Sequence, residues 1–280
     1  MKKTIGIVGL GLIGGSLALS LKHHTDCSVL GADRSEETLR QAISAGAADG
    51  VLEDVTVPDL ILLAVYPDGV LQWLRKFGPV LRPEQTVVDC CGIKTEICRL
   101  GYALGRRYGF SFVGGHPMAG REVAGFSAAS DRLFRGATML LLPEKADDPA
   151  AEKLRPLFLA MGFGAVQYTD PDFHDRMIAY TSQLAHLLSN AYVKSPAALS
   201  CRGFTGGSFQ DLTRVAYLNE HLWCRLFMEN RGPLLSELNR LIDNLSAYRS
   251  ALEEKDETKL TGLLREGREM KEACGVGDRG

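Results

Sequence analysis

The sequence of 280 residues has no long apolar run and no excess of charge of either sign. Its longest purely apolar stretch is the seven residues from Leu60 to Tyr66, well short of the roughly 20 that a membrane-spanning helix needs. The 32 Lys and Arg nearly balance the 34 Asp and Glu, for a formal charge of −2. This balance argues against a nucleic-acid groove or a polybasic membrane patch. We therefore expect neither nucleic acid nor a membrane among the partners.

Paired cysteine motifs are also missing. The seven cysteines are odd in number and lack CxxC spacing, and Cys90 and Cys91 are adjacent. This pattern predicts neither a disulfide framework nor a bound metal, and it favours the reducing cytoplasm. Lys2 and Lys3 before the apolar stretch from Ile5 to Leu21 look like the start of a signal peptide. No small-x-small cleavage site follows Leu21, however, so we do not expect cleavage there.

The whole chain has 45% hydrophobic and 24% charged residues, as is typical of a globular protein. In its first half, short β-rich runs alternate with helical stretches. The runs are continuously apolar, as expected for strands covered by helices on both faces. They are Thr4 to Val8, Cys27 to Ala32, Leu60 to Val65, Thr86 to Asp89, Ser111 to Val113, Ala137 to Leu142 and Gly164 to Tyr168. This rhythm predicts an α/β fold with a Rossmann-type, doubly wound parallel sheet.

After the turn residues from Thr169 to Asp172 the pattern becomes helical. Apolar residues recur at three- and four-residue steps from His174 to Lys194 and from Pro233 to Glu254. We therefore predict a sheet domain at 1–169 and an all-α domain at 170–280. One helical stripe is formed by Leu234, Leu238, Leu241, Ile242 and Leu245. It either packs into a core or forms a dimer interface.

A glycine-rich motif lies between the first predicted strand and helix. Gly9-Leu10-Gly11-Leu12-Ile13-Gly14 would turn tightly, let the backbone approach a pyrophosphate, and pack the helix closely on the strand. Asp33 ends the second predicted strand, where a carboxylate can accept hydrogen bonds from ribose hydroxyls. Because this carboxylate would repel a 2′-phosphate, the sequence favours NAD over NADP. Arg34, which can stack on adenine or pair with a 2′-phosphate, leaves NADP as the less favoured alternative.

A histidine follows the fifth predicted strand in the run from Gly114 to Gly120, at an edge where open α/β sheets bind ligands. Oxidation of an alcohol needs a base of near-neutral pKa to accept the hydroxyl proton as hydride leaves the same carbon. An imidazole meets this need without large tuning. His116 is therefore a candidate for the catalytic base, and the alternative is a histidine with a purely structural role.

Several motifs in order resemble the prephenate and arogenate dehydrogenases of tyrosine biosynthesis. Besides the glycine-rich loop, they are Asp89-Cys90-Cys91-Gly92-Ile93-Lys94, Gly115-His116-Pro117-Met118-Ala119-Gly120, His174-Asp175, Ser182-Gln183-Leu184-Ala185-His186, Asp211-Leu212-Thr213-Arg214, and Trp223 leading to Glu229-Asn230. The resemblance covers nearly the whole chain. It implies a Rossmann domain, a helical domain that forms a homodimer, and NAD-dependent oxidative decarboxylation of prephenate to 4-hydroxyphenylpyruvate.

The resemblance also implies roles for individual residues. His116 would accept the proton of the ring hydroxyl, and Arg214 would bind a substrate carboxylate. Ser182 and His186 would line the substrate pocket, with Trp223 near it. Arg121 is a candidate second carboxylate anchor. On the cofactor side, the expected residues are those of the glycine-rich loop together with Asp33, Arg34, Val65, Asp89 and Gly92.

The chain departs from the family pattern in three places. Gly92 replaces a serine that orients the histidine, Gln183 replaces a histidine, and Arg121 stands where a smaller residue is common. These differences leave arogenate open as the substrate. Two further hypotheses are a β-hydroxyacid-type dehydrogenase, which would carry a lysine where this chain has His186, and a non-catalytic NAD sensor.

Overall fold

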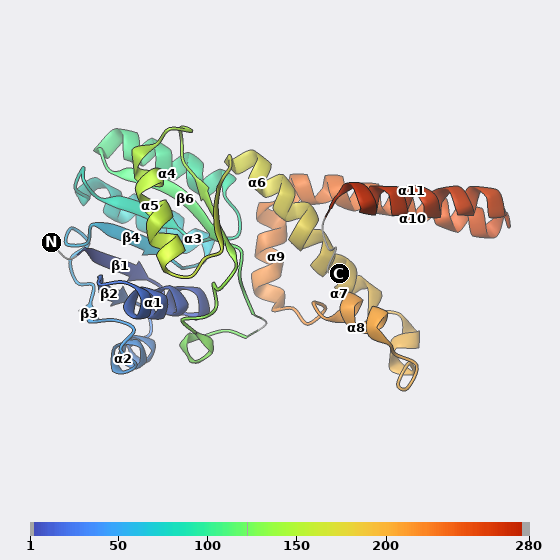
Figure 1. Ribbon diagram of the computed structural model, residues 1–280, viewed down its shortest axis with the longest axis horizontal. Coiled ribbons are helices and arrows are strands. Elements are labelled where there is room, and N and C mark those ends of the chain that lie inside the picture. Colours follow the sequence, from blue (N-terminus) through green and yellow to red (C-terminus); the bar gives the residue numbers. More distant parts are fainter. Residues whose placement is uncertain (1–2, 122, 276–280) are drawn as a thin grey trace. The chain divides into compact units, whose positions relative to one another are not determined.

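The computed structural model describes residues 3–121 and 123–275, which belong to two compact units, 1–230 and 231–280. The first unit contains one eight-stranded sheet (Figure 1). Its strands, in their order across the sheet, are β3 (Gly50–Val51), β2 (Ser28–Ala32), β1 (Thr4–Val8), β4 (Leu60–Leu63), β5 (Thr86–Asp89), β6 (Ser111–Pro117), β7 (Thr138–Leu142) and β8 (Ala165–Tyr168). The Rossmann-type prediction is confirmed, and the short strand β3 is an addition to it.

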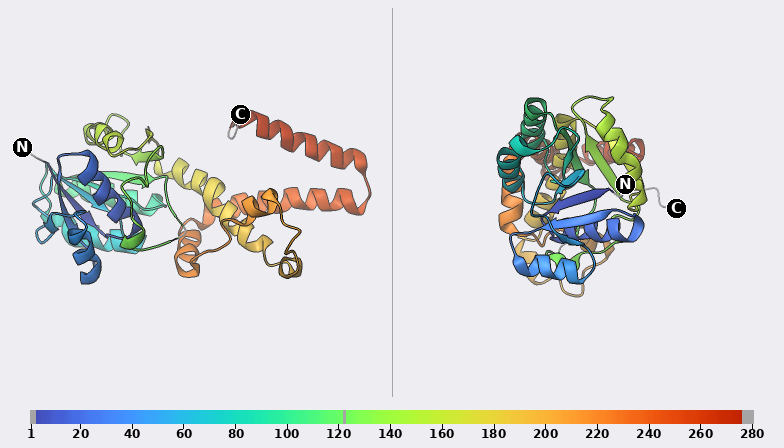
Figure 2. Two further views of the ribbon diagram at one scale, coloured as in Figure 1. Left: turned by 60° about the horizontal axis from the view of Figure 1, so that its bottom comes forward. Right: turned by 90° about the vertical axis from the view of Figure 1, so that its left-hand side faces the viewer.

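Helices cover both faces of this sheet (Figures 1 and 2). One face packs against α1 (Leu12–His24), α2 (Glu36–Ser44) and α5 (Pro149–Ala160), and the other against α3 (Pro67–Phe77) and α4 (Thr95–Tyr108). In β4, Leu60 and Leu62 contribute to the first core, and Ile61 and Leu63 to the second. This double burial is the physical reason for the continuous apolar runs in the sequence.

The sheet is not wholly parallel, which corrects the sequence-based expectation. β6 and β7 are antiparallel, while β7 and β8 are parallel. The chain between β6 and β7 contains only the 3₁₀ turn η2 (Phe126–Ala128) among its described residues. A parallel crossover usually needs a helix, so without one the chain returns along its neighbour in the opposite direction.

Helices make up the rest of the first unit, and no strand follows β8 within the described ranges. They are α6 (Pro171–Ile178), the π-helical segment η3 (Ala179–Leu184), α7 (Ala185–Tyr192), the 3₁₀ turn η4 (Pro196–Leu199), α8 (Gly207–Thr213) and α9 (Glu220–Glu229). Asp170 caps α6 by accepting a hydrogen bond from the backbone N–H of Phe173 at 2.8 Å. The helix therefore begins at Pro171, within the run that the sequence predicted as turn residues, and η3 interrupts what was expected to be a regular helix.

The second unit is a hairpin of α10 (Arg231–Glu253) and α11 (Glu257–Ala273). Part of the predicted apolar stripe on α10 is exposed: Ile242 by 49% and Leu245 by 53%. Leu234, at the start of the same helix, is buried. Among the described residues, no helix is both long and apolar enough to span a membrane.

Candidate active site

The glycine-rich loop has the geometry that a dinucleotide needs. Gly9 has a φ of +87°, and a Cβ there would lie 2.5 Å from the carbonyl oxygen of Ala64. A Cβ on Gly14 would overlap the carbonyl oxygen of Gly9, so only glycine lets α1 pack this closely. At Gly11 no atom of the described residues lies within 4 Å of a Cβ position. The backbone is thus open to a pyrophosphate beside the unpaired N–H groups that begin α1.

Asp33 joins this loop to the end of β2. Its Oδ2 accepts a hydrogen bond from the backbone N–H of Leu10 at 2.7 Å, and its Oδ1 accepts one from Ser35 at 2.9 Å. A carboxylate has about four acceptor positions, so Asp33 retains capacity for ribose hydroxyls. Arg34, the next residue, is exposed.

A buried ion pair lies beneath the ends of β5 and β6. Lys94 and Asp89 are both fully buried, and the Lys94 ammonium donates to the Asp89 carboxylate. Proximity to this carboxylate raises the pKa of Lys94 in spite of the burial that opposes its charge. Asp89 also accepts from the N–H of Cys91 at 3.0 Å. This engagement argues against the direct cofactor contact predicted for the Asp89 side chain.

Val65 and Gly92 follow the ends of β4 and β5, at the same sheet edge as the glycine-rich loop. Val65 reaches the loop itself, since its Cγ1 lies 2.6 Å from a Cβ position on Gly9. Among the atoms that the structure describes, a Cβ on Gly92 would meet only Cε1 and Nε2 of His116, each at 3.8 Å. Gly92 therefore leaves room for a small group beside the Nε2 atom of His116.

His116 is half-buried at the carboxyl end of β6. Its Nδ1 lies 2.8 Å from the Nε2 of His174, and the Nδ1 of His174 lies 2.7 Å from the Oδ1 of Asp175. Burial, with a further contribution from His174 and Lys94, lowers the pKa of His116 well below its ordinary value. The imidazole is thus neutral at neutral pH, as a proton acceptor must be.

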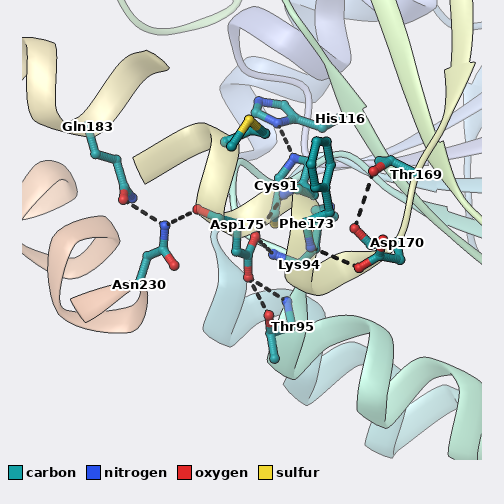
Figure 3. Close-up of polar contacts among 12 residues, drawn as sticks. Cys91, Lys94, Thr95, His116, Thr169, Asp170, Phe173, Asp175, Gln183 and Asn230 are labelled. Carbon is teal, nitrogen blue, oxygen red and sulfur yellow. Dashed lines mark hydrogen bonds and ion pairs between the residues drawn. The ribbon is translucent and has the colours of Figure 1, made fainter. Parts of the chain in front are cut away.

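Asp175 is anchored from two directions. Its carboxylate accepts hydrogen bonds from the backbone N–H groups of Lys94 and Thr95, both at 2.8 Å, and from the Thr95 hydroxyl at 2.6 Å (Figure 3). Its backbone carbonyl accepts from the Asn230 amide at 2.8 Å. The His174-Asp175 pair is part of the family resemblance, but the sequence predicted no role for it. The two residues lie near the start of a capped helix, which is the available sequence signal for them.

Three of the predicted pocket residues lie together. The His186 ring stacks on Trp223 with 3.9 Å between ring centroids, and its Nδ1 lies 2.8 Å from the carbonyl oxygen of Ser182. The residue after Ser182, Gln183, is buried. Its amide donates to the Leu226 carbonyl at 3.0 Å and accepts from Asn230 at 2.8 Å. Gln183 therefore fastens η3 to α9 and lies apart from the His186 face.

The two predicted carboxylate anchors are arginines on different segments. Arg214 directly follows α8, which packs against α7, the helix that carries His186. Arg121 is exposed and lines a cavity of about 260 Å³ together with Gly120, Ser130, Arg132 and Leu133. The backbone N–H of Ser130 donates to the Ser16 hydroxyl of α1 at 3.0 Å. This cavity thus adjoins the helix that begins at the glycine-rich loop.

An open glycine-rich loop and a neutral histidine at the same edge of a doubly wound sheet define a dinucleotide-dependent oxidoreductase. The family model described as prephenate dehydrogenase, nucleotide-binding domain, matches residues 17–166. The model described as prephenate dehydrogenase, dimerization domain, matches residues 170–266. The chain belongs to the prephenate dehydrogenase family.

Individual relatives agree with this assignment. The prephenate dehydrogenase of Bacillus subtilis is 28% identical, over 100% of this chain and 78% of its own. The crystal structure of prephenate dehydrogenase from A. aeolicus, in complex with hydroxyphenyl propionate and NAD+, is 27% identical with a TM-score of 0.82, covering 98% of this chain and 99% of that one. Synechocystis arogenate dehydrogenase is also 27% identical, with a TM-score of 0.81, covering 96% and 99%.

Proposed function

We propose that this protein is an NAD-dependent prephenate dehydrogenase that converts prephenate to 4-hydroxyphenylpyruvate and CO2. The observation that carries the proposal is His116, a neutral imidazole at the sheet edge where the glycine-rich loop opens. The two family models, which together match most of the chain, support it. Arogenate is the second candidate substrate, supported by the similarity to Synechocystis arogenate dehydrogenase.

In this reaction His116 accepts the proton of the ring C4 hydroxyl through its Nε2. Bound NAD supplies the acceptor for the hydride that leaves C4. The bond from C1 to the ring carboxylate then breaks, its electron pair enters the ring, and CO2 departs. The oxygen on C4, left as a phenolate, takes the proton back from His116 to give the phenol. The aromaticity gained provides the driving force, so the protein need only align the hydride, the base and the carboxylates.

The substrate has two carboxylates, and Arg214 and Arg121 are the proposed anchors. A guanidinium can bind a carboxylate through two parallel hydrogen bonds. Ser182, His186 and Trp223 are proposed to line the pocket around the ring. The stacking of His186 on Trp223 supports this arrangement by fixing the plane of both side chains.

The dinucleotide is proposed to lie along the glycine-rich loop from Gly9 to Gly14, with its ribose at Asp33 and Arg34. The free space at Gly11 is where a pyrophosphate can approach the backbone. Val65 and Gly92, at the ends of neighbouring strands, are proposed to flank the nicotinamide. A negative carboxylate at the ribose favours NAD over NADP.

We further propose a division into a cofactor domain at 1–169 and a helical domain at 170–280 that forms a homodimer. The family models, which meet between residues 166 and 170, support the division. The exposed Ile242 and Leu245 on α10 support an apolar interface between two copies.

All seven cysteines are unpaired, which favours the cytoplasm, and the near-neutral charge disfavours a nucleic-acid partner.

The test is the formation of NADH by purified protein mixed with NAD and prephenate, repeated with arogenate and with NADP. Rapid reduction of NAD with prephenate is the expected result. Turnover with arogenate alone would replace prephenate by the second candidate. No turnover in any combination would overturn the proposed activity.

A further inference from the structure

Three ionisable side chains form one continuous hydrogen-bonded row that ends at the proposed base. His116 contacts His174 at 2.8 Å, and His174 contacts Asp175 at 2.7 Å. Each imidazole has one nitrogen that donates and one that accepts when it is neutral. The direction of donation along the row therefore decides which nitrogen of His116 carries a hydrogen.

Asp175 sets that direction because its carboxylate can only accept. Its oxygens already receive three hydrogen bonds, two from backbone N–H groups and one from the Thr95 hydroxyl. Burial alone would raise the pKa of Asp175, but the bonds from His174 and Thr95 outweigh it and lower that pKa. Asp175 is thus ionised, and the Nδ1 of His174 must donate to it.

The hydrogen bond between the Nε2 of His174 and the Nδ1 of His116 then has only one possible direction. Burial lowers the pKa of His174, so the ring is neutral and its Nε2 holds a lone pair. That lone pair accepts a hydrogen bond from Nδ1–H of His116. The Nε2 of His116 is then the nitrogen without a hydrogen, and it lies on the side of the ring that faces Gly92. The charged groups near His116 are the Lys94 ammonium and the Asp175 carboxylate.

We propose that Asp175 and His174 are positioning residues that hold His116 in the tautomer whose Nε2 can accept the substrate proton. The proposal rests on the proposed function of His116 as the base. In the other tautomer Nε2 would carry a hydrogen and could accept nothing. The row has a second effect. The negative carboxylate of Asp175, which is linked to His116 through two hydrogen bonds, stabilises the imidazolium that forms when His116 accepts the proton.

The decisive variant is Asp175→Asn. Its amide oxygen can still accept from Thr95, and its NH2 group then takes the place of Oδ1, faces the Nδ1 of His174 and donates to it, with loss of the hydrogen bond from the backbone N–H of Lys94. This change exchanges the tautomers of His174 and His116 and places a hydrogen on the Nε2 of His116. We expect kcat with prephenate to fall on the order of 10²–10⁴-fold, with little change in the KM for NAD. His174→Gln, which keeps one donor and one acceptor, should retain more activity than His174→Leu.

The chain offers a matched control. Asp131 contacts the Nδ1 of His23 at 3.0 Å at the surface, so Asp131→Asn changes a similar pair away from the row. Its kcat should equal that of the unchanged protein. Full activity of Asp175→Asn would overturn the proposal.

A direct measurement of the tautomer separates this proposal from the proposed function. In protein labelled with ¹⁵N-histidine, NMR shifts distinguish a protonated ring nitrogen from an unprotonated one. We expect His116 to show Nδ1–H and an unprotonated Nε2 at neutral pH, whether or not prephenate is the substrate. Nε2–H in the unchanged protein would refute the row even if the enzyme is active. Absence of turnover with the expected tautomer would refute only the function.

Discussion

The ammonium of Lys94 donates a hydrogen bond to the carbonyl oxygen of Gly115, the residue directly before His116, at 2.5 Å. The same ammonium pairs with Asp89 at the end of the neighbouring strand. One buried cation thus fixes the ends of β5 and β6 to each other at the point where the proposed base leaves the sheet.

Lys94→Met should therefore destabilise the protein. The variant leaves the carboxylate of Asp89 buried without its partner, which typically costs about 3–5 kcal/mol of unfolding free energy. Urea unfolding measures the loss. The double variant Lys94→Met/Asp89→Asn removes the isolated charge and should recover part of the stability. Equal stability of the single and double variants would contradict this account.

Gly92→Ser should be tolerated by the fold. A Cβ at this position has only ordinary contacts with the His116 ring, at 3.8 Å, so the melting temperature should change little. Gly101→Ser is the matched control on α4, because a Cβ there would overlap atoms of the Phe112 ring. The control should lower the melting temperature clearly. An equally large fall in the melting temperature of both variants would contradict the free space beside His116.

Stability should fall as the pH drops below about 6.5, the ordinary pKa of histidine. Burial lowers the pKa values of His116 and His174 in the folded protein. The unfolded chain then binds more protons than the folded one, so acid favours unfolding by up to about 1.4 kcal/mol per pH unit for each histidine. Well above this pH both rings are neutral in both states and contribute nothing.

The pH effect is measured by urea unfolding across the range in which free histidine titrates. His174→Gln should flatten the dependence. An identical slope in His174→Gln would assign the acid sensitivity to other groups.

Asp33→Ser should weaken NAD and relax the discrimination against NADP. The substitution removes the charge that repels a 2′-phosphate and leaves Arg34 beside the ribose site. We expect the KM for NAD to rise on the order of tenfold, equivalent to about 1.4 kcal/mol. Steady-state kinetics with both cofactors checks this. An unchanged ratio of the two KM values would mean that Asp33 does not contact the ribose.

Substituting Ile242 and Leu245 by Glu should dissociate the proposed dimer. Both side chains are about half exposed on α10, so charge there costs a single chain little but opposes an apolar interface. Size-exclusion chromatography with light scattering measures the mass. Leu264→Glu, at an exposed position of α11, tests whether that helix shares the interface. A dimer that survives the double substitution would place the interface elsewhere.

Much of the fold was predictable because β4 and its neighbours are buried on both faces, and continuous apolar runs report this directly. The antiparallel pairing of β6 with β7 was not predictable, because it follows from the absence of a crossover helix in the described part of the connection between them. His116 could be found from its place after a strand. The row through His174 and Asp175 could not, because residues 58 apart in the sequence meet only through tertiary packing. The π-helical turn at η3 likewise leaves no periodicity to detect.

The hydrogen bonds around Asp175 also bear on the order in which the protein becomes competent during synthesis. All eight strands and the glycine-rich loop precede residue 170, so the ribosome delivers the complete cofactor fold first. The proposed base, His116, gains its orientation only when α6 docks on the start of α4, and Asn230 secures that contact later still. A nascent chain could thus hold a dinucleotide before it can use one, which would separate early ligand-assisted folding from the onset of catalysis.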